Sequence, residues 1–213
     1  MGIHEPSFTL GVEEEYLLVD KETRALVIDP PDTLMAEAQE KCGEQVQSEL
    51  LRSQIEVGTK VCSNIQEAHE DLAQLRRNVI KVADRHGLAP IAASTHPFSN
   101  WTEQKRTRKE RYDSLTHEMQ GAARRLVICG MHVHLGLADE ELRIDLRNQL
   151  SDFLPHLLAL SCSSPVWNGH DTGLKSYRLT VFDALPRTGI PERFASFAEY
   201  QRHNSILTDA GLI

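Results

Sequence analysis

Acidic side chains and histidines occur at short, regular spacings in three separate stretches of the sequence. Glu13, Glu14 and Glu15 are consecutive within an otherwise apolar stretch. Burying adjacent carboxylates is costly unless a positive charge neutralises them, and a hard divalent cation such as Mg²⁺ does so by binding carboxylate oxygens. The stretch therefore predicts a metal-binding strand. The alternative is an edge strand whose charged face is solvated.

Two further stretches offer ligands of the same kind. Glu56 follows Glu49 by seven residues, and His132 and His134 are separated by one residue in an apolar stretch. A single histidine on such a strand is usually a hydrogen-bonded core residue. A pair on one face, beside a strand that carries carboxylates, is instead the pattern expected of metal ligands.

The segments that carry these residues have the β-branched and aromatic composition of strands. We expect the three strands at 8–19, 54–62 and 126–137. Side chains alternate between the faces of a strand, so Glu13 and Glu15 should share one face and Glu14 should point to the other. By the same rule Gln54, Glu56 and Gly58 share a face, as do His132 and His134.

Helical spacing of apolar residues and capping residues predict the remaining elements. The clearest helix begins at the capping sequence Ser63-Asn64-Ile65-Gln66 and ends before Gly87. The other expected helices are 32–41, roughly 109–124, one capped by Asp139 that reaches Leu158, and 194–207; short strands are expected at 88–93 and 176–181. At 213 residues the chain has the length of one domain, so we expect a single domain over 1–213.

The composition excludes several classes of protein. Charged residues make up 25% and hydrophobic residues 40% of the 213 residues, as in ordinary globular proteins. The net charge of -8 disfavours nucleic acid as a partner. No apolar run is long enough to span a bilayer and 1–7 has no signal-peptide pattern, so we expect a cytoplasmic protein without a membrane partner.

The sequence lacks the common phosphate-binding and nucleophile motifs. It has no G-x-x-x-x-G-K-[ST] loop and no G-x-G-x-x-G fingerprint. It also has no serine in a G-x-S-x-G context, and its four cysteines have no C-x-x-C spacing. If ATP is used, metal ions and scattered basic residues must hold its phosphates.

Several motifs, taken in order, resemble one family. They are Gly11-Val12-Glu13-Glu14-Glu15, Gln54-Ile55-Glu56-Val57-Gly58-Thr59, Thr95-His96-Pro97-Phe98, Lys109-Glu110-Arg111-Tyr112, Cys129-Gly130-Met131-His132-Val133-His134, Asp171-Thr172-Gly173 and Leu185-Pro186-Arg187-Thr188-Gly189. The set resembles carboxylate-amine ligases of the bacterial glutamate-cysteine ligase type 2 family. Each motif alone is weak, whereas the ordered series covers nearly the whole chain.

The resemblance implies an α+β fold, that of a glutamine-synthetase-like catalytic domain with an antiparallel sheet and helices packed on one face. It implies that ATP phosphorylates a carboxylate, typically the γ-carboxyl of glutamate, and that cysteine or another amine displaces the phosphate. It further implies that divalent metal ions, expected to be Mg²⁺, neutralise the transferring phosphoryl group. The implied small-molecule substrates are glutamate, an amine and ATP.

The resemblance also implies roles for individual residues. Glu15 would share one metal ion with Glu49 and Glu56, while Glu13 would share another with His132 and a later glutamate. His134 is either a ligand or a support for one. Arg111 and Arg178 are the implied holders of a substrate carboxylate or a nucleotide phosphate, and Trp167 is the implied lining residue of the nucleotide site.

Members of this family continue beyond the position of Ile213, with a segment resembling Thr-Leu-Glu-x-Arg that supplies the remaining metal ligand. The expected domain is therefore incomplete, with its C-terminal part missing. One alternative is a catalytically incomplete fragment that binds metal or forms a homodimer through exposed sheet edges. Another is a zinc amidohydrolase that uses His132 and His134, although such barrels need about 250 residues.

Overall fold

The computed structural model describes residues 8–186 and 188–211, except for the side chains of residues 111, 114 and 115. Its strands are β1 (Thr9–Asp20), β2 (Val46–Ser48), β3 (Gln54–Gly58), β4 (Leu88–Ile91), β5 (Met131–Gly136), β6 (Val166–Trp167) and β7 (His170–Asp171). Its α-helices are α1 (Asp32–Cys42), α2 (Ile65–Arg85), α3 (Glu110–Met119), α4 (Gly121–Arg124), α5 (Glu140–Leu150), α6 (Leu154–Ser161), α7 (Arg178–Phe182) and α8 (Phe197–Asp209). The mixture of helices with antiparallel strands confirms the α+β class.

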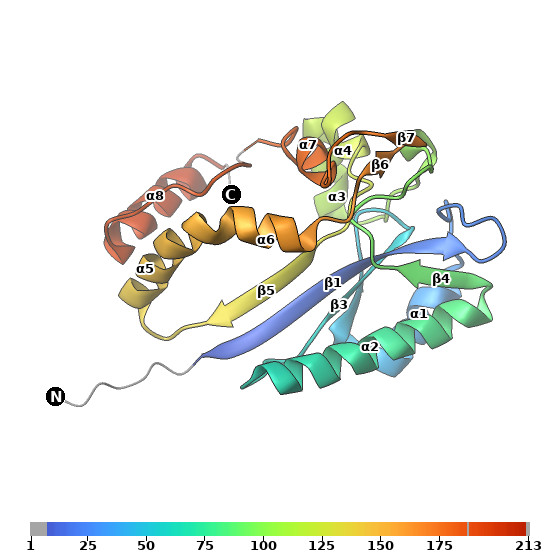
Figure 1. Ribbon diagram of the computed structural model, residues 1–213, viewed down its shortest axis with the longest axis horizontal. Coiled ribbons are helices and arrows are strands. Elements are labelled where there is room, and N and C mark those ends of the chain that lie inside the picture. The colour runs from blue at the N-terminus through green and yellow to red at the C-terminus, as the bar shows by residue number, and fades with distance from the viewer. Residues whose placement is uncertain (1–7, 187, 212–213) are drawn as a thin grey trace.

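β1 is the central strand of the main sheet. β3 pairs with its middle, β5 with its first half and β4 with its last residues, all antiparallel, and β2 extends the sheet beyond β3. Figure 1 shows β5 beside the first part of β1 and β4 beside its last part. β1 therefore holds together strands that are far apart in the sequence.

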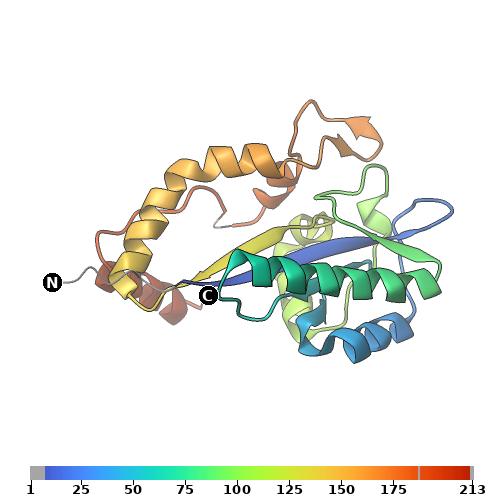
Figure 2. The ribbon, with the colours of Figure 1, turned by 60° about the horizontal axis from the view of Figure 1, so that its bottom comes forward.

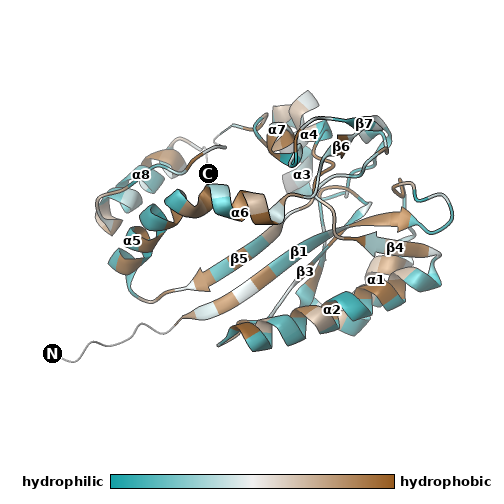
Figure 3. Ribbon diagram, viewed as in Figure 1, coloured by the Kyte–Doolittle hydropathy of each residue, from teal (hydrophilic) through white to brown (hydrophobic). Residues whose placement is uncertain are grey.

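One face of the sheet is covered by α1 and α2. Tyr16 and Leu18 of β1 pack with Ile55 and Val57 of β3 against the apolar side of these helices, and all four side chains are buried. The hydrophobic and hydrophilic bands that alternate along α2 in Figure 3 reflect this one-sided burial. Asn64 caps α2 by accepting a hydrogen bond from the Glu67 backbone N–H, as the capping sequence predicts.

The expectation of helices on one face only is wrong. A second buried cluster lies on the opposite face around Leu17, where Tyr112 of α3, Ala123 of α4 and Val181 of α7 pack against it. Leu17 alternates with the buried Leu18, so β1 carries apolar side chains on both faces at this end. Strands buried on both faces need a layer on each side.

Several expected elements differ from the structure. The strand expected at 54–62 ends at Gly58, and the strand expected at 126–137 begins at Met131. Three further elements differ in kind or continuity. The segment expected as a strand at 176–181 contains α7 instead, whose first residue, Arg178, donates its backbone N–H to Ser164 Oγ at 3.1 Å. The expected helix 109–124 is interrupted at Gln120, which has a positive φ of 46°. The helix after Asp139 is interrupted by a 3₁₀ turn, Ser151–Phe153, before α6.

α5 and α6 form an arch on the side of the sheet opposite to α2, as Figures 1 and 2 show together. β5 is exposed along its whole length, and within the described part of the chain it pairs only with β1. None of the described helices combines the length and apolarity needed to cross a bilayer.

Candidate metal and substrate site

The alternation of β1 sends its three glutamates to different environments. Glu14 points to the helix-covered face, where it is buried and accepts hydrogen bonds from Arg76 at 2.5 and 2.6 Å and from the Tyr16 hydroxyl. A guanidinium therefore neutralises Glu14, and no metal ion is needed there. Glu13 and Glu15 point to the other face, as the sequence predicts.

Strand pairing brings the other predicted ligands to the face of Glu13 and Glu15. Glu15 is directly opposite Glu56 of β3, and Glu13 is directly opposite His132 of β5. His134 is opposite Gly11, which has no side chain between the histidine and Glu13. Four of the five predicted metal ligands thus lie on three adjacent strands, and Glu49 approaches from the segment that precedes β3.

Glu13, His132 and His134 form the most compact group. His132 Nδ1 and His134 Nε2 each lie 3.1 Å from the same atom, Glu13 Oε2. Partial burial of Glu13 disfavours its charge, but the hydrogen bonds from His134 and His132 outweigh that effect and lower the pKa of Glu13. Among the described residues, this is the one group whose three ligand atoms all lie within 4.8 Å of one another.

Glu15, Glu49 and Glu56 form a looser acidic group beside it. Burial, a hydrogen bond to Glu49 and the nearby charges of Glu49, Glu13 and Glu15 raise the pKa of Glu56 to about 8. Burial, with the charge of Glu49, also raises the pKa of Glu15, although Glu15 Oε2 accepts a 2.8 Å hydrogen bond from Gly130 N. Mutual repulsion of this kind is what a divalent cation relieves, and an all-oxygen donor set fits Mg²⁺.

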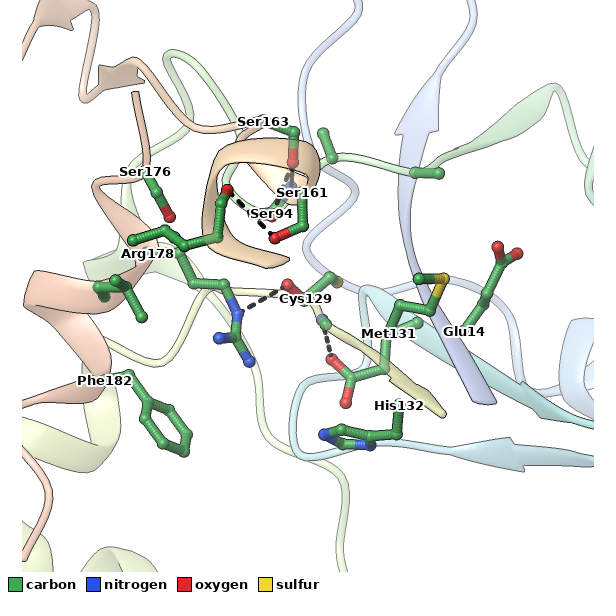
Figure 4. A pocket seen from close by; sticks show the side chains of 16 residues that line it. Glu14, Ser94, Cys129, Met131, His132, Ser161, Ser163, Ser176, Arg178 and Phe182 are labelled. Atoms are coloured by element: carbon green, nitrogen blue, oxygen red, sulfur yellow. Dashed lines mark hydrogen bonds between the residues drawn. The ribbon is translucent and has the colours of Figure 1, made fainter. Parts of the chain in front are cut away.

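A cavity of about 480 Å³ adjoins the acidic group, with Glu15 and His132 in its lining. It lies where β4 and β5 separate from β1. Figure 4 shows Ser94, Ser161 and Ser163 at one end of the cavity, His132 at the other and Arg178 between them. Its lining also includes apolar side chains, Leu158 and Phe182 among them.

Arg178 is held so that its guanidinium faces this cavity. Its Nε donates to the Cys129 carbonyl at 3.0 Å, and the guanidinium carbon lies 5.2 Å from the centroid of the Phe182 ring. A terminal nitrogen lies 2.9 Å from the position that a Cβ would occupy at Gly130. A side chain at position 130 would therefore displace the guanidinium.

The remaining predicted site residues lie elsewhere. Trp167 is buried in the second core, 5.4 Å from the Tyr177 ring, and does not line the cavity. Its predicted contact with a nucleotide stays a prediction. Arg111 belongs to α3, but its side chain lies outside the described part of the chain, as does the whole of Arg187.

No pattern in the sequence selects the serines of the cavity. Ser94 comes from the loop after β4 and Ser163 from the loop after α6, yet their hydroxyl oxygens lie 2.7 Å apart. Serine is common in loops, so only the fold reveals their convergence. His134 carried a usable signal, its place beside His132 on one strand face, although its role remained open between ligand and support.

Comparison with known proteins agrees with the family resemblance of the sequence motifs. The sequence profile of Glutamate-cysteine ligase family 2 (GCS2) matches residues 9–213. Proteins named "Putative glutamate--cysteine ligase 2" from Rhodospirillum rubrum and Ruegeria pomeroyi are 59% and 56% identical to this chain, over 99% and 100% of its residues. The chain spans about half the length of these relatives, 55% in both cases.

Two solved structures share the fold at low sequence identity. A glutamate–cysteine ligase from Francisella tularensis in complex with AMP aligns with a TM-score of 0.66 and 14% identity, over 84% of this chain and 43% of that protein. A bifunctional glutathione synthetase from Pasteurella multocida aligns with a TM-score of 0.75 and 14% identity, over 95% of this chain and 30% of that protein. At this identity the likeness concerns the fold.

Proposed function

Because this chain belongs to glutamate-cysteine ligase family 2, we propose that it carries the metal-binding site of an ATP-dependent carboxylate-amine ligase. The domain is of the glutamine-synthetase-like type, acts in the cytoplasm and takes glutamate, an amine and ATP as small-molecule substrates. The observation that carries the proposal is the convergence of Glu13, Glu15 and Glu56 with His132 on one sheet face.

The proposed reaction proceeds in two displacements. A γ-carboxylate oxygen of glutamate attacks the γ-phosphorus of ATP and ADP leaves, which gives an acyl phosphate. The amine nitrogen then attacks the acyl carbon, phosphate leaves, and the amine loses a proton. Divalent cations, when bound, neutralise the phosphoryl oxygens during the first displacement.

The chain's own residues bind and orient the reactants. Glu15, Glu49 and Glu56 offer oxygen ligands to Mg²⁺ on the face that adjoins the cavity. Arg178, fixed by the Cys129 carbonyl, faces the cavity where it can bind a substrate carboxylate or a nucleotide phosphate through its terminal nitrogens. We assign Arg111 the same kind of role, because it stands in the Lys109-Glu110-Arg111-Tyr112 motif.

The amidohydrolase alternative is not supported by the fold. Such enzymes place their metal ligands on parallel strands of a barrel, whereas His132 and His134 lie on β5, which pairs antiparallel with β1. The alternative of a metal-binding or dimerising fragment remains a proposal. The exposed β5 favours it, because an unpaired strand edge can accept a strand from another chain.

The test is glutamate-dependent release of phosphate from ATP with a panel of amines. The chain is assayed beside the full-length Rhodospirillum rubrum relative, which controls for the assay conditions. Ligase function predicts amine-stimulated turnover that Glu15→Gln and His132→Ala each reduce by about 100-fold or more while the fold is preserved. Full activity in both variants would refute the metal assignments, and magnesium-dependent stabilisation without turnover would favour the fragment.

A further inference from the structure

The peptide group that joins Cys129 to Gly130 lies between two residues of the candidate site. Its carbonyl oxygen, on Cys129, accepts a hydrogen bond from Arg178 Nε at 3.0 Å, which Figure 4 shows on the wall of the cavity. Its N–H, on Gly130, donates to Glu15 Oε2 at 2.8 Å. One planar group therefore holds a cationic and an anionic side chain at its two ends.

Backbone contacts hold this peptide group at one further point on each side. The Cys129 N–H donates to the Ser94 carbonyl at 3.0 Å, and the Gly130 carbonyl accepts from the Glu15 N–H at 3.1 Å. Cys129 and Gly130 both precede the first residue of β5, so the regular ladder with β1 does not include them. The orientation of the peptide group therefore depends on these contacts and on the side chains that reach the segment.

Gln54 is the buried side chain that anchors this segment from β3. Its Nε2 donates to the Ile128 carbonyl at 2.7 Å and to Cys129 Sγ at 3.4 Å, and its Oε1 accepts from the Leu51 N–H at 3.3 Å. The residue is 4% exposed, so these contacts satisfy an amide that water does not reach. Gln54 precedes Glu56 by two residues, so the strand that carries an acidic ligand also fixes the segment beside the cavity.

We infer that Gln54 is a positioning residue that couples Glu15 to Arg178 through the Cys129–Gly130 peptide group. A guanidinium that polarises the carbonyl of a peptide group strengthens its N–H as a donor. A rotation of the peptide plane that misaligns one of the two hydrogen bonds also misaligns the other. A cation on Glu15 and an anion on Arg178 should then influence each other's binding reciprocally. The inference rests on the proposed function for these two ligands.

The alternative is a purely structural role for Gln54, and Gln45 provides the matched control. Gln45 Nε2 also donates to a backbone carbonyl, that of Gly58, at 3.0 Å, and to Asp71 at the same distance. Gln45 lies in the 3₁₀ turn before β2 and does not line the cavity. Gln54→Met and Gln45→Met therefore remove the same kind of hydrogen bond at different distances from the site.

The first measurement is hydrogen exchange of the Gly130 N–H and the Arg178 Nε–H, followed by NMR on the chain in EDTA. Circular dichroism and thermal unfolding verify that each variant is folded. We expect Gln54→Met to accelerate exchange about tenfold at both groups and Gln45→Met at neither. Arg178→Met, at a half-buried position, should also accelerate exchange of the Gly130 N–H, and it tests the coupling if Gln54→Met does not fold.

The second measurement is calorimetric titration with MgCl₂. We expect affinity reduced about fivefold in Gln54→Met and unchanged in Gln45→Met. Glu15→Gln combined with Gln54→Met should bind Mg²⁺ no more weakly than Glu15→Gln alone, because Gln54 acts through Glu15.

Unchanged exchange at Gly130 in Gln54→Met and Arg178→Met would overturn the inference, as would wild-type Mg²⁺ affinity in Gln54→Met. Either result with normal ligase turnover would leave the proposed function standing. Accelerated exchange as expected, in a chain that shows neither Mg²⁺ binding nor turnover, would refute the proposed function and leave Gln54 as the residue that positions this peptide group.

Discussion

Glu15 and Glu56 are directly opposite each other in the ladder between β1 and β3, so two carboxylates share one sheet face. Among the described residues, the positive charges with the largest effect on Glu15 are those of His132 and Arg178, whereas Glu49 adds a further negative charge. The pair is therefore unfavourable without a cation, and this property leads to the first two predictions.

The stability of the metal-free chain should fall as the pH rises. The pKa of Glu56 is about 8 in the folded chain and near 4.5 when unfolded, so the folded state binds the extra proton between these values. The stability that protonation of Glu56 contributes is fully present below about pH 4.5 and is lost as the pH rises through about 8. Glu56→Gln removes this loss. In EDTA, its melting temperature should match that of wild type at pH 5 and exceed it at pH 9.

At high pH, Mg²⁺ should reverse the difference in melting temperature between wild type and Glu56→Gln. Because Glu56 must lose its proton to bind a cation, the affinity for Mg²⁺ should increase with pH through the same window. Wild type should therefore be stabilised by Mg²⁺ more at pH 9 than at pH 6, and Glu56→Gln should show little response at either pH. A pH-independent response of wild type would contradict the assignment of Glu56 as a ligand.

Glu15→Gln should remove most of the Mg²⁺-dependent increase in melting temperature. The substitution keeps the size of the side chain and can still accept the Gly130 N–H hydrogen bond, but it removes the charge that attracts the cation. Stabilisation by a ligand depends on the ratio of the free ligand concentration to Kd. A variant that binds Mg²⁺ more weakly therefore shows a smaller increase in melting temperature. Glu44→Gln, at an exposed position, is the control and should keep the full shift.

Arg76→Met should destabilise the chain by about 2 kcal/mol. Loss of the guanidinium leaves the Glu14 carboxylate buried with only the Tyr16 hydroxyl as partner, and Arg76 is itself half-exposed, so the cost is smaller than for a fully buried pair. Urea unfolding of Arg76→Met, Glu14→Gln and the double variant gives the coupling. Additive effects would show that Glu14 and Arg76 do not stabilise each other.

Gly130→Ala should weaken substrate binding and leave stability nearly unchanged. The new Cβ would meet the Arg178 terminal nitrogen at 2.9 Å, and a flexible guanidinium can move away at low cost. Calorimetric titrations with glutamate and with ATP in Mg²⁺ should show about a tenfold loss of affinity for the ligand that Arg178 binds. Gly121→Ala, where a Cβ meets nothing within 4 Å, should bind both ligands normally.

The site was predictable where it depends on the two-residue period of strands. Alternation placed Glu13 and Glu15 on one face and Glu14 on the other, and it grouped Gln54 with Glu56. The order of strands in the sheet was not predictable, because it depends on pairings such as Glu13 with His132 across more than a hundred residues. The resemblance to a known family supplied only the expectation that Glu13 and His132 share a metal ion.

Other features depended on contacts that no local pattern encodes. Arg76 is one of many charged residues on α2, and only the packing of that helix against β1 selects it as the partner of Glu14. Segment 176–181 has a strand-like composition, yet Ser164 accepts the Arg178 N–H and a helix begins there. Tertiary contacts outweigh local propensity in so short a segment.

β1 lies at the centre of the sheet, so a single strand both supports the fold and carries candidate site residues. It pairs with three strands and buries apolar side chains on both faces, and it also carries Glu13 and Glu15. A substitution that disturbs its backbone would unfold the domain before any change in metal affinity could be measured. Varying the candidate site by mutation is therefore more practicable on β3 and β5, where Glu56 and His132 lie on the same sheet face as Glu13 and Glu15.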